Sequence, residues 1–303
     1  MGLLIGFTTI IVVICAGLGL AHAGVLDARS QRTLGEIAFF VASPALMVTT
    51  IGKTHIGGAA TNLVASATAL ATSFAVYAVI ARLRWRLDGG SVLIGSLSSS
   101  YVNAGNLGLA IAAYVVRDIT IVVPTLLVQM LVVQPLALVA LDRRAGRGRG
   151  SLAVLRRLVT NPLTGAALLG GVLAVTGWTL PRVVAQPLDL LAGAAIPLML
   201  MSYGAALRLS PLPGRAGHNR EVLTVVVLKL VFMPVVAWLV ATALGLDGAV
   251  LLGVVLTAAL PTAQNIFLHA TRYRVGEDVA RESILVTTLC SLPVALLVAV
   301  LLG

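Results

Sequence analysis

Apolar stretches long enough to cross a lipid bilayer recur along the whole chain, and they constrain its fold more than any other feature. A helix of about 20 residues spans the hydrocarbon core. The ten stretches of that length are residues 2–22, 33–53, 60–82, 91–116, 119–141, 158–177, 182–207, 221–244, 248–271 and 280–302. The chain is 59% hydrophobic and 11% charged, too few polar residues to cover a soluble globule. We therefore predict an all-α membrane protein with ten transmembrane helices.

The basic residues are distributed unevenly between the connections that join these stretches. If the N-terminus is outside, five connections lie inside, at residues 22–32, 82–90, 142–157, 208–220 and 272–281. They hold 17 of the 21 lysines and arginines, the bias that marks cytoplasmic loops. We predict a multi-pass protein of the bacterial cytoplasmic (inner) membrane with both termini outside. The net charge of +10 then orients the chain in the lipid bilayer and does not indicate a nucleic-acid partner.

A hydrophilic segment rich in arginine and glycine, residues 142–150, separates the first five stretches from the last five. We interpret it as a cytoplasmic linker. It divides the chain into two predicted domains, residues 1–141 and residues 151–303. Each domain would contain five transmembrane helices.

Short proline-containing motifs recur across this linker in the same order. Residues 43–47 resemble residues 196–200, and residues 134–139 resemble residues 292–297. Because five is an odd number, two successive five-helix repeats cross the membrane in opposite directions. The sequence thus predicts a 5+5 inverted repeat.

The fourth stretch is interrupted by residues that do not suit a continuous helix. Gly105 and Gly108 permit backbone angles that other residues resist. Asn103 and Asn106 tolerate the left-handed region and carry amides that both donate and accept hydrogen bonds. We expect the helix to break here and to expose these groups.

The ninth stretch contains a second interruption. Pro261 lacks an N–H group and clashes with the preceding helical turn. Thr262, Gln264 and Asn265 follow it and supply a hydroxyl and two amides. We expect a second break at these residues.

Two breaks at equivalent places in repeated halves indicate a transporter binding site. Helices 4 and 9 would cross at the membrane midplane, where half-helix N-termini suit an anion and freed carbonyls suit a cation or a proton donor. The alternative is a pair of kinked helices whose polar residues only join neighbouring helices.

Ionisable residues inside apolar stretches are functional candidates because they are costly to bury. Lys229 lies within the eighth stretch and Asp189 within the seventh. We assign both to charge balance or proton coupling. The alternatives are a Lys229 side chain that extends to the membrane surface and an Asp189 carboxylate solvated in a vestibule.

No pattern in the sequence indicates an enzyme. There is no nucleophile elbow, phosphate-binding loop or pair of clustered acids, and the four histidines and two cysteines are too scattered for a metal site. We therefore predict no catalytic residues, no metal and no cofactor.

The two breaks resemble those of the auxin efflux carrier family, which includes plant carriers and bacterial carriers of small carboxylates such as malonate or malate. The residues that carry the resemblance are 103–109, 161–163, 195–204 and 258–265. The resemblance implies a scaffold domain, a mobile domain that holds the crossing helices, elevator-like movement and a homodimer. By motif match, Asn103, Asn106 and residues 261–265 would line the substrate site. The family usually has a proline where this sequence has Ala110, which implies a gentler first break.

These observations predict a secondary transporter that moves a small organic anion, a mono- or dicarboxylate. One alternative is a sodium-coupled organic-anion symporter of the bile-acid type, which needs acidic and polar sodium ligands that this sequence supplies poorly. Another is a membrane sensor that binds a ligand without moving it. A counterflow assay separates a transporter from a sensor.

Overall fold

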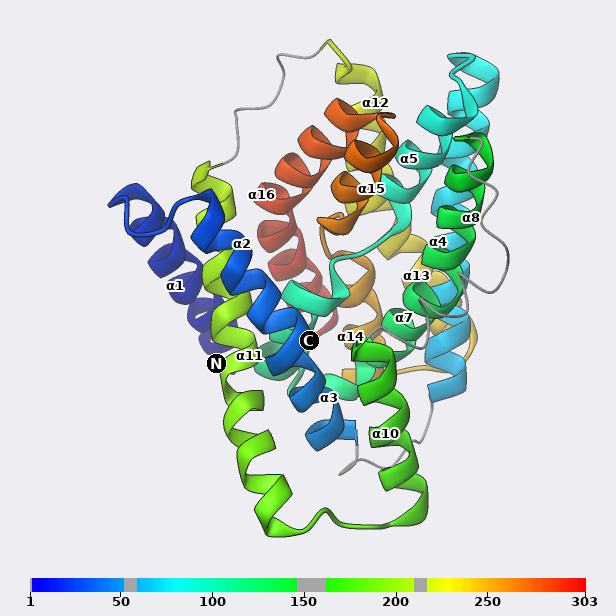
Figure 1. The fold of residues 1–303 in the computed structure, drawn as a ribbon. Coiled ribbons are helices and arrows are strands. Elements are labelled where there is room, and N and C mark those ends of the chain that lie inside the picture. Colours follow the sequence, from blue (N-terminus) through cyan, green and yellow to red (C-terminus); the bar gives the residue numbers. More distant parts are fainter. Residues whose placement is uncertain (1, 52–58, 146–161, 210–216) are drawn as a thin grey trace. The chain divides into compact units, whose positions relative to one another are not determined.

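The computed structural model describes residues 2–51, 59–145, 162–209 and 217–303, and these residues are mostly helical (Figure 1). Seven of their helices are long and apolar enough to cross a membrane: Ile5–His22, Ala28–Ile51, Ala60–Arg84, Ile119–Arg144, Arg182–Leu209, Asn219–Ala243 and Glu277–Leu302. Three shorter apolar helices are Ala104–Val116, Pro162–Thr176 and Gly248–Ala258. The predicted class, a membrane protein built from helices, is confirmed. The ten-helix inverted repeat stays a prediction.

Some predicted features fall outside the described residues. They are residues 146–150 of the linker, residues 52–53 of the second stretch, residues 158–161 of the sixth stretch, and five arginines of the inner connections, Arg147, Arg149, Arg156, Arg157 and Arg215.

The chain forms two compact units. Unit 1 comprises Met1–Gly58, Gly105–Val123 and Leu155–Pro211, and unit 2 comprises Ala59–Ala104, Pro124–Val154 and Leu212–Gly303. Each unit therefore combines segments from both sides of the predicted linker. The units group predicted helices 1 and 2 with 6 and 7, and predicted helices 3 to 5 with 8 to 10, apart from the second half of helix 4.

Unit 1 contains α1 (Gly2–His22), α2 (Ala28–Ile37), η1 (Ala38–Ala42), α3 (Ser43–Ile51), α6 (Leu109–Ile111), η4 (Ala112–Val116), η5 (Ile119–Val122), α10 (Pro162–Thr176) and α11 (Arg182–Leu209). Helix α1 packs along α11. Gly17 and Gly204 face the partner backbone at this contact, where a Cβ atom would overlap the carbonyls of Met201 and Ile14. Small residues allow this close approach of two helices.

Unit 2 contains α4 (Ala59–Val79), η2 (Ile80–Arg84), α5 (Gly89–Ser100), most of α7 (Val123–Val128), η6 (Gln129–Val133), α8 (Gln134–Arg144), α12 (Asn219–Val227), η7 (Leu228–Phe232), α13 (Met233–Ala243), α14 (Gly248–Ala258), α15 (Asn265–Tyr273) and α16 (Glu277–Leu302). Helix α5 packs against α4, α12, α15 and α16. Gly95 of α5 lies directly against the ring of Tyr77 on α4.

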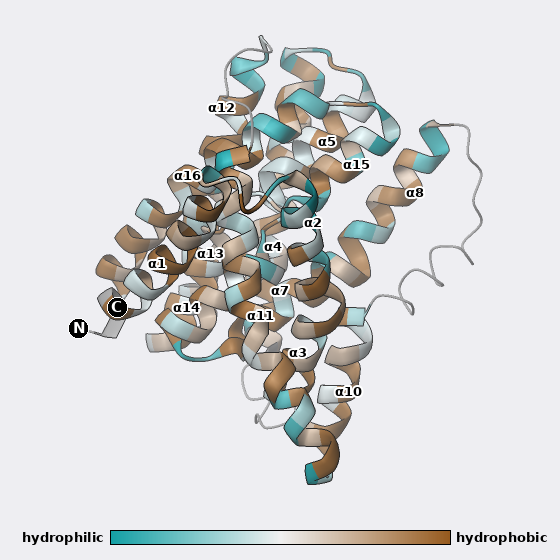
Figure 2. Ribbon diagram, turned by 60° about the vertical axis from the view of Figure 1, so that its left-hand side comes forward, coloured by the Kyte–Doolittle hydropathy of each residue, from teal (hydrophilic) through white to brown (hydrophobic). Residues whose placement is uncertain are grey.

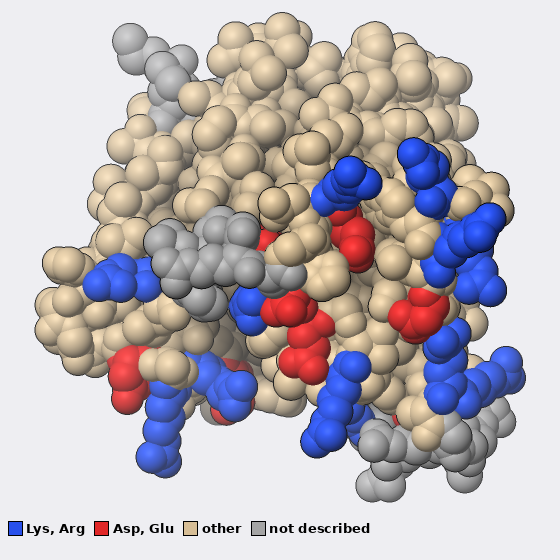
Figure 3. Space-filling model, turned by 90° about the horizontal axis from the view of Figure 1, so that it is seen from above, with Lys and Arg blue, Asp and Glu red and all other residues tan. Residues whose placement is uncertain are grey.

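Most helical turns are apolar, and many of the hydrophilic residues lie near helix ends (Figure 2). In unit 2, Arg144 Nη2 lies 3.2 Å from Asp88 Oδ1, and Tyr273 donates to Asp142 Oδ1 over 2.6 Å. The start of α5 and the ends of α8 and α15 therefore lie at the same end of unit 2. Figure 3 views the molecule from this end and shows many arginine and lysine side chains with fewer carboxylates.

Candidate functional site

The first break lies between α5, which ends at Ser100, and the π-helical turn η3 (Ala104–Gly108). Residues 101–103 leave the helix, and Tyr101 is extended at φ −78° and ψ 111°. Gly105 and Gly108 permit unusual backbone angles, but the break does not use this freedom, because neither is among the described glycines with positive φ and Gly108 is helical. With Ala110 in place of proline, three residues still leave the helix. Contacts from distant parts of unit 2 hold them extended, as described below.

The second break lies where Pro261 predicts it. Helix α14 ends at Ala258 and α15 begins at Asn265, and the residues between them are not helical. Proline removes a donor and excludes the preceding turn. The predicted interruption of the ninth stretch is confirmed.

The two breaks pair with each other inside unit 2. Val102 and Thr262 form an antiparallel bridge. The Asn103 N–H donates to the Pro261 carbonyl over 2.8 Å, and the Ala263 N–H donates to the Tyr101 carbonyl over 3.1 Å. The prediction that the fourth and ninth stretches break and meet is thereby confirmed.

A buried glutamine that the sequence did not single out stabilises the first break. Gln129 is 1% exposed and begins η6. Its Oε1 accepts from the Val102 N–H over 2.6 Å, and its Nε2 donates to the Val102 carbonyl over 3.1 Å. The amide replaces both hydrogen bonds that Val102 would make in a helix. An amide in the middle of an apolar stretch was the signal that could have identified it.

Side chains from other segments of unit 2 satisfy the last carbonyls of α5. The Thr262 hydroxyl donates to the Ser98 carbonyl over 2.6 Å, and the Ser73 hydroxyl donates to the Ser99 carbonyl over 2.7 Å. Terminal carbonyls of a helix have no intrahelical partner, so these bonds stabilise the early end of α5.

Thr262 takes part in the crossing mainly as a structural residue. It is fully buried, and its N–H donates to the Thr287 hydroxyl over 3.1 Å. Since its hydroxyl and its N–H both have partners, neither is available to a ligand in this conformation.

The side-chain amide of Asn103 carries a donor that has no partner in the described part of the chain. Its side chain is 4% exposed, and its Nδ2 atom has no hydrogen-bond partner among the described residues. Asn265 Oδ1, at the start of α15, likewise has none within the described ranges. Gln264 and Asn265 are partly exposed, so their amides are accessible to a ligand. Buried polar groups are normally paired, so these amides mark the crossing as a candidate binding site.

The remaining predicted site residues are divided between the two units. Gly105, Asn106 and Gly108 follow Asn103 in the chain and belong to unit 1, with Asn106 partly exposed. Lys229 is in unit 2, fully buried, and donates from Nζ to the Ser100 carbonyl over 3.4 Å.

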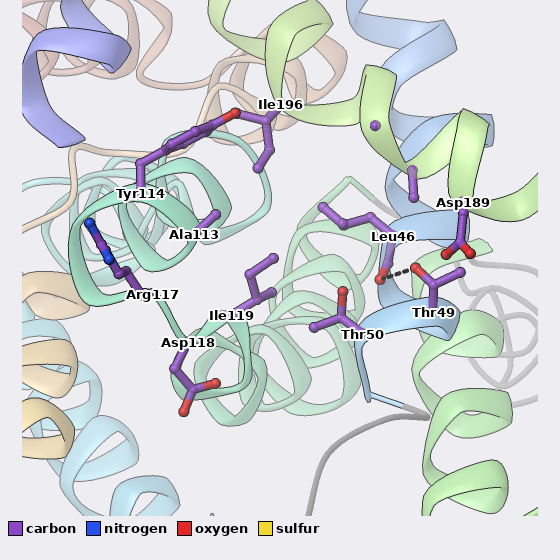
Figure 4. Close-up of a pocket in the computed structure, with 12 residues that line it drawn as sticks. Leu46, Thr49, Thr50, Ala113, Tyr114, Arg117, Asp118, Ile119, Asp189 and Ile196 are labelled. Atoms are coloured by element: carbon purple, nitrogen blue, oxygen red, sulfur yellow. Dashed lines mark hydrogen bonds between the residues drawn. The ribbon is translucent and has the colours of Figure 1, made fainter. Parts of the chain in front are cut away.

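Asp189 lines a cavity of about 560 Å³ in unit 1. Thr49, Thr50, Arg117 and Asp118 also line it (Figure 4), so its wall carries charges of both signs. Across the described ranges, no group of three or more His, Cys, Asp or Glu side chains is arranged to hold a metal ion.

Comparison with known proteins identifies the family of this chain. The family model described as "Membrane transport protein" matches residues 5–299. The "Putative malonate transporter" of Rhizobium meliloti (strain 1021) is 29% identical over 297 residues, which cover 90% of this chain and 89% of that protein.

Plant proteins match a shorter segment. Auxin efflux carrier component 1 of Arabidopsis thaliana is 28% identical over 156 residues, covering 50% of this chain and 25% of the plant protein. Auxin efflux carrier component 3a of Oryza sativa subsp. japonica is 28% identical over the same length, with the same coverage. The predicted resemblance is confirmed, and the chain belongs to the membrane transport protein family, the family of the auxin efflux carriers.

Proposed function

We propose that this protein is a secondary transporter that moves a small organic anion, a mono- or dicarboxylate, across the bacterial cytoplasmic membrane. The observation that carries the proposal is the pairing of two broken helices beside a buried amide with an unused donor, Asn103 Nδ2. Transporters with repeated halves bind their substrates where such discontinuous helices meet. The family supplies the same expectation.

The donors around the crossing suit a carboxylate. Asn103, Gln264 and Asn265 carry amide groups, which hydrogen-bond carboxylate oxygens without a fixed charge. Helix α15 begins at Asn265 with no side-chain cap on its N-terminus. The dipole of α15 favours a negative ligand at this end. In the proposed site Asn106 adds a further amide, while Gly105, Gly108, Pro261 and Thr262 shape the backbone.

Alternating access would follow from the division into two units. Unit 2 holds the crossing and would be the mobile domain of an elevator-type mechanism, with unit 1 as the scaffold of a homodimer. The grouping of predicted helices 1, 2, 6 and 7 and of predicted helices 3 to 5 and 8 to 10 supports the inverted repeat, because each unit then contains equivalent helices from both halves. Both termini would lie outside.

Two ionisable residues would serve charge balance or proton coupling, Lys229 beside the crossing and Asp189 in the unit 1 cavity. If Asp189 carries a proton, Asp189→Asn abolishes the response of uptake to an imposed pH gradient. Unchanged dependence on the gradient would remove Asp189 from this role.

A thermal-shift screen against small organic acids tests the binding site. Ligands that bind the native state raise its melting temperature. We expect malonate or a related acid to stabilise the wild type and to lose this effect in Asn103→Leu. Gln31→Leu is the control, since this amide donates to Ser202 within unit 1, whereas the paired breaks belong to unit 2. An equal shift in wild type and Asn103→Leu would refute the assignment.

A further inference from the structure

Lys229 is a fully buried lysine with no ion pair to a carboxylate in the described part of the chain. It stands in η7, and its Nζ lies 3.4 Å from the Ser100 carbonyl and 3.1 Å from Met233 Sδ. Removing an ammonium group from water is costly unless another charge or a set of carbonyl dipoles offsets it. A protonated Lys229 therefore needs local stabilisation.

The end of α5 supplies that stabilisation. The last four carbonyls of a helix lack intrahelical partners and carry about half a negative charge in total. In α5 each of these four carbonyls accepts a hydrogen bond. The Leu97 carbonyl accepts from the Tyr101 N–H, and the Ser98 carbonyl accepts from Thr262. The Ser99 carbonyl accepts from Ser73, and the Ser100 carbonyl accepts from Lys229. Three of the donors are neutral, and Lys229 is the one that can carry a charge.

The position of this contact links it to the binding site. Ser100 is the last residue of α5, and the chain becomes extended at the next residue, Tyr101. Two residues later the Asn103 N–H bonds the Pro261 carbonyl. A donor that holds the Ser100 carbonyl therefore helps to fix where the helix ends and how Asn103 is presented.

We propose that Lys229 is a positioning residue whose ammonium group neutralises the carbonyl end of α5 and holds the first break in register with the second. It touches no substrate and acts through α5. The expected effect of Lys229 on transport rests on the proposed function. Its expected effect on the end of α5 does not depend on any substrate.

Chemical rescue separates the charge of Lys229 from its bulk. Lys229→Ala removes the atoms from Cγ to Nζ, which n-propylammonium can replace, and n-propanol has nearly the same shape without the charge. Lys229→Met keeps the bulk and leaves no space. Met233→Leu is the matched control, because it removes the sulfur contact and leaves the carbonyl contact in place.

We expect Lys229→Met and Lys229→Ala to lower organic-acid uptake by about tenfold, as loss of a charge-assisted bond to a buried carbonyl implies. n-Propylammonium should raise the melting temperature and uptake of Lys229→Ala, n-propanol should raise neither, and Lys229→Met should respond to neither. Met233→Leu should behave as wild type. The proposal is overturned if n-propanol rescues as well as the amine, or if Lys229→Met melts and transports as wild type.

The melting readout distinguishes this proposal from the proposed function. Rescue of the melting temperature in a protein whose wild type binds and transports no organic acid would support the role of Lys229 and refute the function. Transport by the wild type without any rescue by the amine would support the function and refute the role of Lys229.

Discussion

The two breaks meet in one place but arise in different ways. In the ninth stretch Pro261 interrupts the helix by its own chemistry, since it cannot occupy a helix interior without losing a bond and clashing. In the fourth stretch the residues outside the helix are Tyr101, Val102 and Asn103, none of which excludes a helix. Side chains from elsewhere in unit 2 create that break. One break is therefore local in origin and the other is tertiary.

The tertiary break depends on donors and acceptors that are distant in sequence. Gln129 bonds both backbone groups of Val102, while Thr262, Ser73 and Lys229 bond the last carbonyls of α5. Tyr and Val also favour extended backbone, so the segment adopts this conformation easily once partners are present. Substitution of the partners should therefore affect the first break more than substitution of its own residues.

The largest effect is expected for Gln129→Leu. It leaves the buried N–H of Val102 without a partner, which costs about 1–3 kcal/mol. The Val102 carbonyl loses one bond, worth about 1 kcal/mol, but still accepts from the Ala104 N–H over 2.8 Å. We expect the free energy of unfolding to fall by about 2–4 kcal/mol, measured by thermal or denaturant unfolding in detergent.

Gln134→Leu serves as the control for Gln129→Leu. It removes one bond, from the Tyr101 hydroxyl to a partly exposed glutamine at 3.2 Å. If both substitutions destabilise the protein equally, Gln129 has no special role in the break.

A smaller effect is expected for Thr262→Val, which keeps the shape of the side chain and removes its hydroxyl. The Ser98 carbonyl would lose its donor at the end of α5, at a cost of about 1–3 kcal/mol. Thr257→Val is the matched control, because Thr257 is also buried but donates to the Gly253 carbonyl of its own helix. Equal melting temperatures of the two variants would contradict the proposed dependence of α5 on its neighbours.

The smallest effect is expected at the opposite end of α5, where Asp88 is the N-cap. Asp88 Oδ1 accepts from the Gly90 N–H over 2.8 Å, and loss of such a cap costs about 1 kcal/mol. The Ser91 side chain, followed by the N–H groups of Gly90 and Ser91 and by Arg144, lowers the pKa of Asp88, against a smaller opposing effect of burial.

Because this pKa is lowered in the folded state, the cap stabilises the protein at neutral pH and is lost as the pH falls below about 4. Melting curves should therefore separate wild type from Asp88→Ala at pH 7 and converge in acid. Arg144→Ala should change stability by less than about 0.5 kcal/mol, because the ion pair is exposed. A larger loss in Arg144→Ala than in Asp88→Ala would show that the ion pair, not the cap, stabilises α5.

The contrast between a local and a tertiary break explains which parts of the site the sequence could predict. Pro261 and the amides after it identify the second break because their effect is local. The first break was expected among Asn103, Gly105, Asn106 and Gly108, and it includes Asn103 and begins at Tyr101. The two glycines lie in the helical turn that follows, since glycine permits a break without requiring one. The true position of the first break depends on Gln129, whose partner cannot be read from the chain.

The helical class was also predictable, because apolar segments of this length have few other folds available. The division into compact units does not follow from the repeats, because each unit draws on both sequence halves, and the two five-helix repeats stay a prediction. Asp189 and Lys229 were identified as unusual in an apolar setting, but only the structure reveals that one lines a cavity and the other reaches the end of α5.

The central claim is that the paired breaks bind an organic anion that the protein then carries across the membrane. Counterflow in proteoliposomes tests it most directly, with unlabelled malonate inside and labelled malonate outside. We predict that the wild type accumulates label above equilibrium and that Asn103→Leu, with an unchanged melting temperature, does not. Equal accumulation by both proteins would place the binding site elsewhere, and no accumulation of any small organic acid by the wild type would contradict the account.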